Sequence, residues 1–494
     1  MNYEGMQPLY TAAQTRALDR AAIDSGIPGI TLMTKAAHAA FDCMRSQWPD
    51  AKQVQVLCGT GNNGGDGFLL ADIAHKRGLQ VTVLQLGDPN KIEGDALTAR
   101  KQALANGVPV QTFDGAIVPL GIVVDAMLGT GLGGDVRGDY IDAIAQINGL
   151  GLPVLALDIP SGLCSDTGRV LGVAVRADVT ISFIGLKRGL LTASGSDYCG
   201  DLEFADLDVP VEVIDGLPHS AVRVDLEAML EQIPLRSAAS HKGLYGNVLV
   251  IGGDHGMAGA AILAAEAALR CGAGLVRVAT RPEHVAAVVA RAPEAMARGI
   301  NSTLDLLAMV DEANALVVGP GLGQSEWSEQ LLRVAADSGK TLILDADALN
   351  LLALERGIEQ ASRPNWILTP HPGEAARLLA QTNLHVQRDR FAAATALQDR
   401  FGGVAVLKGN GTLVRSASST LLCDYGNPGM ASGGMGDVLS GVLGSLVAQG
   451  LSLTDAASLG VALHAAAADI AAAEEGERGL LATDLIPRMR ALLG

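Results

Sequence analysis

Aromatic residues are scarce in this chain of 494 residues, because phenylalanine, tryptophan and tyrosine together make up 3% of it. Single-stranded nucleic acid is bound largely by stacking bases on aromatic side chains, so the sequence argues against such a ligand. Positive charge is also in short supply: 36 lysines and arginines stand against 53 aspartates and glutamates, for a net charge of −17. A nucleic-acid backbone would be repelled overall, and any phosphate ligand must be bound by local loops.

The chain also lacks paired cysteines and long hydrophobic runs. Its six cysteines include no C-x-x-C pair, which leaves no readable zinc site and is typical of reduced thiols in a cytosolic protein. The first ten residues contain no apolar signal segment. The longest alanine-rich run, residues 458–473, contains His464 and Asp469, so we interpret it as a packed internal helix. We predict a cytoplasmic protein without nucleic-acid or membrane partners.

Length and pattern indicate two α/β domains. A chain of 494 residues exceeds the size at which one hydrophobic core keeps growing. Short β-branched runs end in glycine or aspartate and are followed by helical patterns, which is typical of parallel α/β units. The predicted strands are residues 54–57, 81–86, 122–124 and 154–157 in the first half, and 247–251, 275–279, 316–318, 341–344, 366–368 and 404–407 in the second.

Prolines and acidic residues over positions 209–219 interrupt this rhythm, so we place a boundary near residues 215–225 and expect domains at 1–220 and 221–494. The pair Asn410-Gly411 before Thr412 predicts a β-hairpin, and hence an antiparallel piece at the edge of the second sheet. The two halves share no strict repeat, which favours fusion over duplication.

A glycine run over residues 427–437 ends in Asp437, just before the apolar stretch 438–448. A helix that starts there would direct unpaired backbone N–H groups and its positive dipole end at an anion, most naturally a phosphate. Asp437 would be placed to accept a proton from a hydroxyl that attacks or leaves beside that phosphate. The simpler alternative is that the aspartate only caps the helix.

In the first half, the predicted strand at 54–58 runs into a glycine loop, 59–67, which precedes a helical pattern over 68–76. The loop does not reproduce G-x-G-x-x-G, so ordinary nicotinamide-dependent oxidoreductase chemistry is not favoured. Asp125, Asp158 and Ser161 follow two further strands, and parallel strands would bring them to one rim with Asn62 and Asn63. Such an oxygen-rich pocket would hold a hard cation. Alternatively, the two aspartates cap turns.

Residues 9–208 resemble the YjeF N-terminal family of NAD(P)H-hydrate epimerases, on the matches at 62–67, 125–134 and 158–162. The resemblance implies a Rossmann-like three-layer αβα sandwich, and K⁺ held by Asn63, Asp125 and Ser161. It also implies that acid–base chemistry at carbon 6 of the damaged nicotinamide ring falls to Asp158. The implied substrate-binding residues are Asn62, Asn63, Gly64, Gly65, Asp66, Gly129, Thr130, Gly131, Leu132, Gly133, Gly134, Asp135 and Asp158.

In the second half, the motifs that carry chemistry again lie after predicted strands. They are the loop 252–260, the glycine turn 319–323, Asp345 and Asp347, His371 and Glu374, and the segment 408–412. The single lysine in the last segment, Lys408, either extends to the surface or forms half of a phosphate clamp with the loop before Asp437.

Together with residues 434–437, these segments resemble the YjeF C-terminal family, the NAD(P)H-hydrate dehydratases of the ribokinase superfamily, from about residue 226 onward. His371 stands where sugar kinases of that superfamily have the asparagine of Asn-x-x-Glu, which speaks against a plain sugar kinase. The resemblance implies a ribokinase-like fold, ADP as phosphoryl donor, and Mg²⁺ organised partly through Glu374. The implied nucleotide site is Lys408, Gly409, Asn410, Gly411, Thr412 and Gly436, and the implied substrate site is Ala260, Gly323, His371 and Asp437.

The two resemblances together predict a metabolite-repair enzyme, expected as a homo-oligomer. It would interconvert the R and S forms of hydrated NADH and NADPH, and dehydrate the S form at the expense of ADP to give AMP and phosphate. One alternative is a small-molecule kinase of the ribokinase superfamily fused to a nucleotide-binding module. Another is a non-enzymatic scaffold whose loop at 62–67 binds a nucleotide or a protein.

Overall fold

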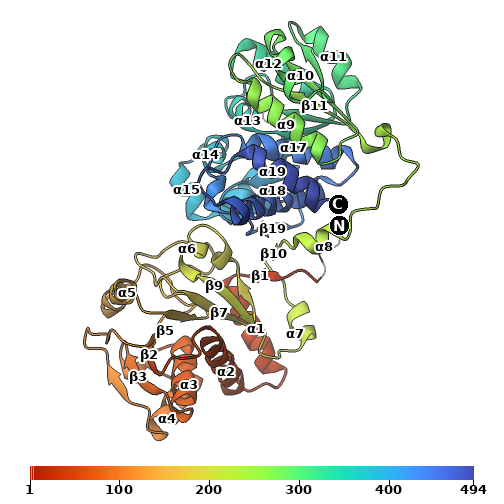
Figure 1. Cartoon of the computed structure of the whole chain (residues 1–494). Coiled ribbons are helices and arrows are strands. Elements are labelled where there is room, and N and C mark those ends of the chain that lie inside the picture. Colours follow the sequence, from red (N-terminus) through yellow and green to blue (C-terminus); the bar gives the residue numbers. More distant parts are fainter. Residues whose placement is uncertain (2, 4, 360) are drawn as a thin grey trace. The chain divides into compact units, whose positions relative to one another are not determined.

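The structure, a computed structural model, describes residues 1, 3, 5–359 and 361–494. It divides into two compact units, Gln7–Ala221 and Val222–Gly494, and the first six residues belong with the second unit (Figure 1). Tyr3 Oη donates a hydrogen bond to Asp455 in that unit at 2.6 Å. A boundary placed from sequence at residue 220 assigns these six residues to the first domain, because nothing local in the sequence reports where they pack.

The N-terminal unit is built on a parallel sheet with strand order β4-β3-β2-β5-β6-β7-β9. Residues of α1–α4 form the core on one face and residues of α5 the core on the other, which confirms the three-layer αβα prediction. The strands are β1 (Pro8–Tyr10), β2 (Gln53–Cys58), β3 (Gln80–Gln85), β4 (Val110–Thr112), β5 (Ile122–Ala126), β6 (Val154–Leu157), β7 (Val179–Phe183), β8 (Leu186–Lys187) and β9 (Asp201–Ala205). The helices are α1 (Ala12–Asp24), α2 (Gly29–Gln47), α3 (Asn62–Lys76), α4 (Gly94–Ala105), α5 (Asp139–Leu150), α6 (Gly195–Cys199) and α7 (Val211–Asp215).

Helix α3 begins at Asn62, so residues 62–67 form its first turns and not the loop that the glycines predicted. These glycines serve close packing instead of an unusual backbone conformation. A Cβ on Gly65 would lie 2.6 Å from Met33 Sδ, and a Cβ on Gly67 would lie 2.5 Å from the Cβ of Ala126 on β5. A Cβ on Gly64 would collide with the Gly59 carbonyl oxygen. The glycines therefore let the start of α3 lie directly on the sheet.

The C-terminal unit contains a mixed sheet with strand order β13-β12-β11-β14-β15-β16-β17-β18-β19-β10. Pairing is parallel from β13 to β17 and antiparallel between β17, β18 and β19, which confirms the hairpin predicted at Asn410-Gly411. The strands are β10 (Ala221–Arg223), β11 (Asn247–Ile251), β12 (Leu275–Thr280), β13 (Met296–Gly299), β14 (Ala315–Val318), β15 (Thr341–Leu344), β16 (Trp366–Leu368), β17 (Val404–Leu407), β18 (Thr412–Arg415) and β19 (Thr420–Cys423).

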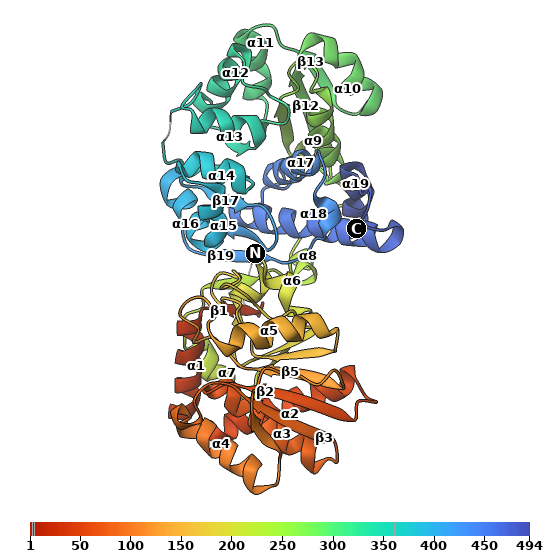
Figure 2. The same ribbon diagram turned by 90° about the vertical axis from the view of Figure 1, so that its left-hand side faces the viewer.

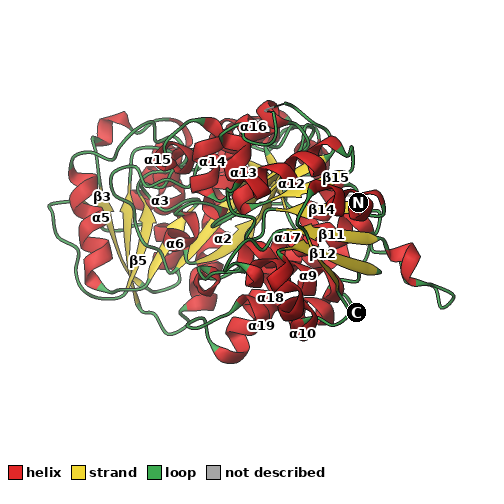
Figure 3. Ribbon diagram, turned by 90° about the horizontal axis from the view of Figure 1, so that it is seen from above, coloured by secondary structure: helices red, strands yellow, loops and turns green. Residues whose placement is uncertain are grey.

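Helices cover both faces of this second sheet. Figures 2 and 3 show α9, α17, α18 and α19 on one face, and α12, α13, α14 and α16 on the other. The helices are α8 (Leu226–Leu230), α9 (Ala258–Arg270), α10 (Val285–Arg291), α11 (Thr303–Asp311), α12 (Glu326–Asp337), α13 (Ala346–Ala353), α14 (Pro372–Leu379), α15 (Asn383–Arg388), α16 (Arg390–Phe401), α17 (Met435–Ala448), α18 (Leu453–Glu475) and α19 (Ala482–Leu492).

Helix α18 is the one helix in the described part of the chain that is long and apolar enough to cross a membrane by length and composition. However, 78% of its most apolar window is buried inside the structure, where its alanines pack with α17 and α19 in the core of the C-terminal unit. The interpretation of residues 458–473 as an internal helix is confirmed.

Candidate functional site

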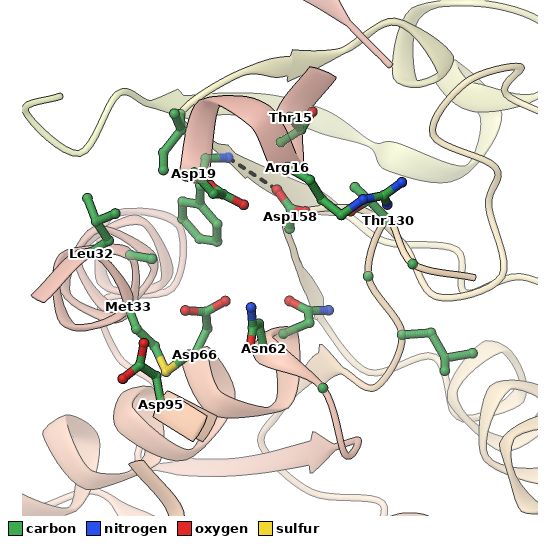
Figure 4. A pocket seen from close by; sticks show the side chains of 18 of the residues that line it. Thr15, Arg16, Asp19, Leu32, Met33, Asn62, Asp66, Asp95, Thr130 and Asp158 are labelled. Atoms are coloured by element: carbon green, nitrogen blue, oxygen red, sulfur yellow. Dashed lines mark hydrogen bonds between the residues drawn. The ribbon is translucent and has the colours of Figure 1, made fainter. Parts of the chain in front are cut away.

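In the N-terminal unit, a cavity of about 520 Å³ opens where β2, β5 and β6 end. Figure 4 shows its walls, which come from α1, α2, α3, the loop after β5 and the residue after β6. Of the predicted substrate-binding residues, the cavity is lined by Asn62, Asn63, Asp66, Gly129, Thr130, Gly131, Leu132, Gly133 and Asp158. Gly64 and Gly65 are instead buried in α3, and Gly134 and Asp135 are exposed beyond the lining loop.

Asp125 and Ser161 form a buried hydrogen-bonded pair beneath this rim. Ser161 donates from its backbone N–H to Asp125 Oδ2 at 2.7 Å and from its hydroxyl to Oδ1 at 2.6 Å. Burial raises the pKa of Asp125 to about 6, although the hydrogen bonds from Ser161 and Met127 lower it. The carboxylate is therefore fully desolvated, and only local N–H and O–H donors stabilise its charge.

The side chain of Asn63 is also buried, and within the described residues neither its Oδ1 nor its Nδ2 has a hydrogen-bond partner. It packs beside the predicted loop, since a Cβ on Gly129 would lie 3.3 Å from the Cβ of Asn63. A buried amide without partners costs about 1–3 kcal/mol for the unsatisfied group, so the side chain of Asn63 is suited to bind a group from outside the chain. An amide oxygen, a hydroxyl and a carboxylate are the donor set of a hard cation such as K⁺.

Asp158 follows β6 with a left-handed backbone conformation, φ 67°, which non-glycine residues adopt at some energetic cost. Its carboxylate forms an ion pair with Lys187, whose side chain is fully buried. Lys187 Nζ also donates to Ser182 Oγ and to the Phe183 carbonyl, both at 3.1 Å. The lysine is thus held rigidly beneath Asp158, at the cavity wall.

Two further carboxyl groups that line the same cavity have raised pKa values. Burial first, and then the charges of Asp158 and Asp19, hold the pKa of Asp66 well above its ordinary range, while Lys187 lowers it. Burial likewise raises the pKa of Asp19 on α1 to about 6, against the opposing effect of Lys187. The sequence analysis missed Asp19 and Lys187. Lys187 offers the same signal as Lys408, a single lysine soon after a buried strand, whereas Asp19 lies inside an ordinary helical pattern.

In the C-terminal unit, the predicted residues gather around the ends of β15 and β17. Asp345 follows β15, is 1% exposed, and accepts hydrogen bonds at 2.8 Å from both Lys408 Nζ and Thr369 Oγ1. A Cβ on Gly436 would lie 3.1 Å from Lys408 Nζ. The structure therefore brings the lysine and the glycine loop together. It adds Asp345 as the partner that fixes the lysine.

Asp437 lies in the first turn of α17, and the N-cap of that helix is Gly434, so the alternative that Asp437 serves as the cap is wrong. Burial raises the pKa of Asp437 to about 7, with further increases from Asp345 and Asp347 and a decrease from Lys408. A carboxylate that titrates near neutral pH is suited to accept a proton during catalysis.

The loop predicted to bind nucleotide, residues 408–412, is shaped by Arg390, which is 1% exposed. Arg390 donates to the carbonyl oxygens of Leu407 and Lys408 at 3.2 Å and of Gly411 at 3.3 Å. Thr412 Oγ1 closes the turn by donating to the Gly409 carbonyl at 2.9 Å. No sequence motif pointed to Arg390, because it lies on α16, away from every glycine motif.

His371 is the N-cap of α14 and forms a capping box with Glu374. His371 Nδ1 accepts from the Gly373 N–H at 3.0 Å, and Glu374 Oε2 accepts from the His371 N–H at 2.8 Å. Glu374 lies 4.0 Å from Lys408 Nζ, and burial raises its pKa to about 7. The Glu374 carboxylate is therefore beside the lysine that the phosphate clamp requires.

The glycine turn contacts Asp347 and α9. The Gly323 N–H donates to Asp347 Oδ2 at 2.9 Å, and a Cβ on Gly321 would lie 3.1 Å from the Cβ of Ala260 on α9. Asp347 also raises the pKa of Asp437. The predicted substrate-binding residues of the turn and of α9 are therefore linked to Asp437 through Asp347.

Comparison with known proteins identifies the family. A model of NAD(P)H-hydrate dehydratase matches residues 248–490, and one of the YjeF-related protein N-terminus matches residues 29–189. Over 490 residues the chain is 47% identical to the bifunctional NAD(P)H-hydrate repair enzyme of Coxiella burnetii, with 99% of this chain and 100% of that one covered. The chain belongs to the bifunctional NAD(P)H-hydrate repair enzymes.

Other members of this repair-enzyme family are similar over nearly their full length. The enzyme of Escherichia coli K12 is 43% identical, with 98% of this chain and 94% of that one covered. The enzyme of Leishmania major is 42% identical, with 97% and 92% covered. The family predicted from the motifs is therefore confirmed for the whole chain.

Two solved structures are similar to about half of this chain. A ribokinase-like superfamily protein from Enterococcus faecalis superimposes with a TM-score of 0.51 and 29% identity, covering 55% of this chain and 94% of that one. A protein from Streptococcus mutans does so with a TM-score of 0.51 and 32% identity, covering 55% and 100%. These similarities confirm the ribokinase-like fold of the C-terminal unit.

Proposed function

We propose that the two units of this repair enzyme divide the work on hydrated NADH and NADPH. The N-terminal unit interconverts the R and S epimers at carbon 6, and the C-terminal unit removes water from the S epimer at the expense of ADP, giving AMP and phosphate. The observation that supports this division is that each unit has its own group of candidate site residues. One is the cavity with Asn63 and Asp158, and the other is Asp437 on α17 beside Lys408.

For the dehydratase we propose that Asp437 accepts the proton of the carbon 6 hydroxyl as that oxygen attacks the β-phosphorus of ADP. Hydroxide is a poor leaving group, whereas phosphate departs readily from the resulting ester as the enamine nitrogen of the ring supplies electrons, and loss of a proton from carbon 5 then forms the carbon 5–carbon 6 double bond. A positioned carboxylate base typically contributes about 10²- to 10⁴-fold. The pKa of about 7 keeps Asp437 available in its basic form at neutral pH.

The charge of the transferring phosphoryl group would be met by Lys408 and by the free N–H groups at the start of α17, close to Gly436. The loop over Lys408, Gly409, Asn410, Gly411 and Thr412 is proposed to bind the nucleotide, with Arg390 fixing its shape. His371, Gly323 and Ala260 are proposed to contact the hydrated cofactor.

Glu374 suits the role proposed for it with Mg²⁺. Mg²⁺ in such sites is usually bound through one or two carboxylates together with substrate phosphates, and Glu374 is a buried carboxylate close to Lys408. When bound, the ion would neutralise charge on the diphosphate. Glu374 itself would orient this end of the site through its hydrogen bond from the His371 N–H.

For the epimerase we propose that K⁺ is held by Asn63, Asp125 and Ser161. The unpartnered amide of Asn63 and the desolvated carboxylate of Asp125 fit such an ion. When bound, it would supply positive charge beside the substrate. Asp158, presented to the cavity by its left-handed backbone and its ion pair with Lys187, is proposed to take part in proton transfer at carbon 6.

A single assay tests both activities. Purified protein is mixed with chemically hydrated NADH or NADPH, ADP, Mg²⁺ and K⁺, and absorbance of the reduced nicotinamide is followed. We expect complete recovery from an R and S mixture, and slow, partial recovery when the N-terminal activity is disabled by Asp158→Asn. A phosphorylated product that accumulates without recovery of absorbance would instead favour the alternative function, a small-molecule kinase fused to a nucleotide-binding module.

Two expectations about the whole protein also belong to this proposal. We propose a cytoplasmic homo-oligomer, because hydrated cofactors arise where NADH and NADPH are used and because most soluble oligomers are symmetric assemblies of one chain. Analytical ultracentrifugation of the full chain would reveal the assembly as a mass larger than the 50.7 kDa of one chain.

A further inference from the structure

Four carboxylates, those of Asp19, Asp66, Asp95 and Asp158, line the cavity of the N-terminal unit together with Lys187 and Arg16. Figure 4 shows Asp19 and Asp158 on one wall, and Asp66 on the facing wall with its carboxylate directed toward them. These side chains come from α1, from the end of β6 and from α3, so three separate parts of the fold converge. Lys187 joins the first wall through its ion pair with Asp158.

The charges in this cavity do not balance. Lys187 is committed to Asp158 and to two oxygens of β7, which leaves Asp19 and Asp66 without an ammonium partner of their own. Arg16, which also lines the cavity, lowers the pKa of Asp19. The charged groups that act on Asp66 are Asp158, Asp19 and Lys187, and the net effect of burial and of these charges holds the pKa of Asp66 well above its ordinary range. One proton therefore stays in the cavity, on the wall opposite the ion pair.

Inversion at carbon 6 needs chemistry on both faces of the ring, because a bond must break on one side and form again on the other. We propose that Asp66 is the general acid of the epimerase and acts on the face opposite Asp158, while Asp19 is a positioning residue that keeps the proton on Asp66. This inference rests on the epimerase function proposed above for the N-terminal unit. The geometry supplies its basis, since the two groups face each other across one cavity.

In this mechanism the carbon 6–oxygen bond is the one that breaks. Asp66 gives its proton to the carbon 6 hydroxyl, which leaves as water while the lone pair of the ring nitrogen forms a nitrogen–carbon 6 double bond. A water molecule then adds to carbon 6 from the opposite face and gives a proton to the Asp158 carboxylate, and the electron pair returns to nitrogen. Proton exchange with solvent then restores both protonation states, and the other epimer reacts through the same steps in reverse.

The first test is the pH dependence of kcat/KM for epimerisation in the full chain, with K⁺ present. Activity of the unmodified protein should fall at alkaline pH as Asp66 loses its proton. We expect Asp66→Asn to lower kcat/KM by about 10²- to 10⁴-fold. Asp19→Asn should retain more activity but move the alkaline fall by roughly one unit to lower pH, because removal of a nearby negative charge weakens the hold on the Asp66 proton.

Two controls isolate these effects. Asp24→Asn removes an exposed carboxylate at the end of the same helix, α1, and should leave the pH profile in place. Dehydration of purified S epimer by the C-terminal unit reports whether each variant chain is correctly folded in that unit. The measurement that tests Asp19→Asn is the pH at which activity falls on the alkaline side. If Asp19 had only a structural role, the substitution would lower activity without shifting that pH.

The second test uses water labelled with ¹⁸O. Cleavage of the carbon 6–oxygen bond requires one labelled oxygen to enter the substrate with each inversion, above the exchange seen without enzyme. Inversion without incorporation of ¹⁸O would overturn the mechanism. Unchanged activity of Asp66→Asn would also overturn it, as would an alkaline fall in activity that occurs at the same pH in Asp19→Asn as in the unmodified protein. If the unmodified protein does not interconvert the epimers at all, the proposed epimerase function fails instead.

Discussion

Replacing Asp437 by asparagine should have opposite effects on activity and stability. The substitution removes the proposed base, so we expect kcat/KM for dehydration to fall by about 10²- to 10⁴-fold, equivalent to roughly 3–5 kcal/mol of transition-state stabilisation. In the unmodified protein, kcat/KM should rise as pH increases through about 7, where Asp437 loses its proton. The variant should lack this rise.

Stability should change in the other direction. The pKa of Asp437 is about 7 in the folded protein against an ordinary 3.8, so the folded chain holds a proton that the unfolded chain releases between those values. Its contribution to stability is therefore lost as pH rises from about 4 to 7. At 1.36 kcal/mol per pH unit, the penalty above pH 7 is at most about 4 kcal/mol. Asp437→Asn should remove it.

The assay compares melting of the full chain at pH 5 and pH 8, using the transition that added ADP raises. We expect the Asp437→Asn variant to gain more in melting temperature at pH 8 than at pH 5. Asp399→Asn, which changes an exposed carboxylate on α16, should show no such difference. The reasoning is refuted if Asp437→Asn dehydrates the hydrate at the normal rate, or if its stability gain is larger at pH 5.

Three other substitutions test separate parts of the structure. Asn63→Ala should abolish the stimulation of epimerisation by K⁺, and a variant that still responds to the ion would contradict the proposed ligand set. Lys408→Met leaves the buried Asp345 carboxylate unpaired, so we expect about 3–5 kcal/mol lower stability of the C-terminal unit in urea, with epimerisation retained in the absence of denaturant. Gly67→Ala places a Cβ 2.5 Å from that of Ala126, and overpacking of about 1–3 kcal/mol should lower the melting temperature of the N-terminal unit while dehydration of the S epimer continues.

The strands of both sheets could be predicted from sequence wherever they are continuous and apolar. Residues 247–251, 341–344, 366–368 and 404–407 coincide with β11, β15, β16 and β17, because strands buried on both faces read as unbroken β-branched runs. β7 was missed since Thr180 and Ser182 interrupt its pattern, although both are fully buried. The glycines of residues 62–67 were misread because close packing and loop flexibility require the same residue type.

The candidate sites were predictable at strand ends and at the glycine run before Asp437. Asp158 and Asp345 directly follow β6 and β15, and Asp125 is the second-last residue of β5, so their positions at the rims of the sheets follow from parallel pairing. Asp19 and Arg390 reach the same sites from α1 and α16, and no local pattern distinguishes them from surface residues, whereas Lys187 on β8 offers only the signal of a single lysine soon after a buried strand. Their importance depends on contacts across many residues of chain, which only the folded structure reveals.

The first six residues give the chain an unusual path, because it starts in the C-terminal unit, builds the N-terminal unit and then returns. Met6 is buried in the C-terminal core and Tyr3 is bonded to Asp455 there. A single proteolytic nick near residue 221 would therefore leave the fragments attached through that short anchor. Separating the units for independent study requires a second cut, after residue 6.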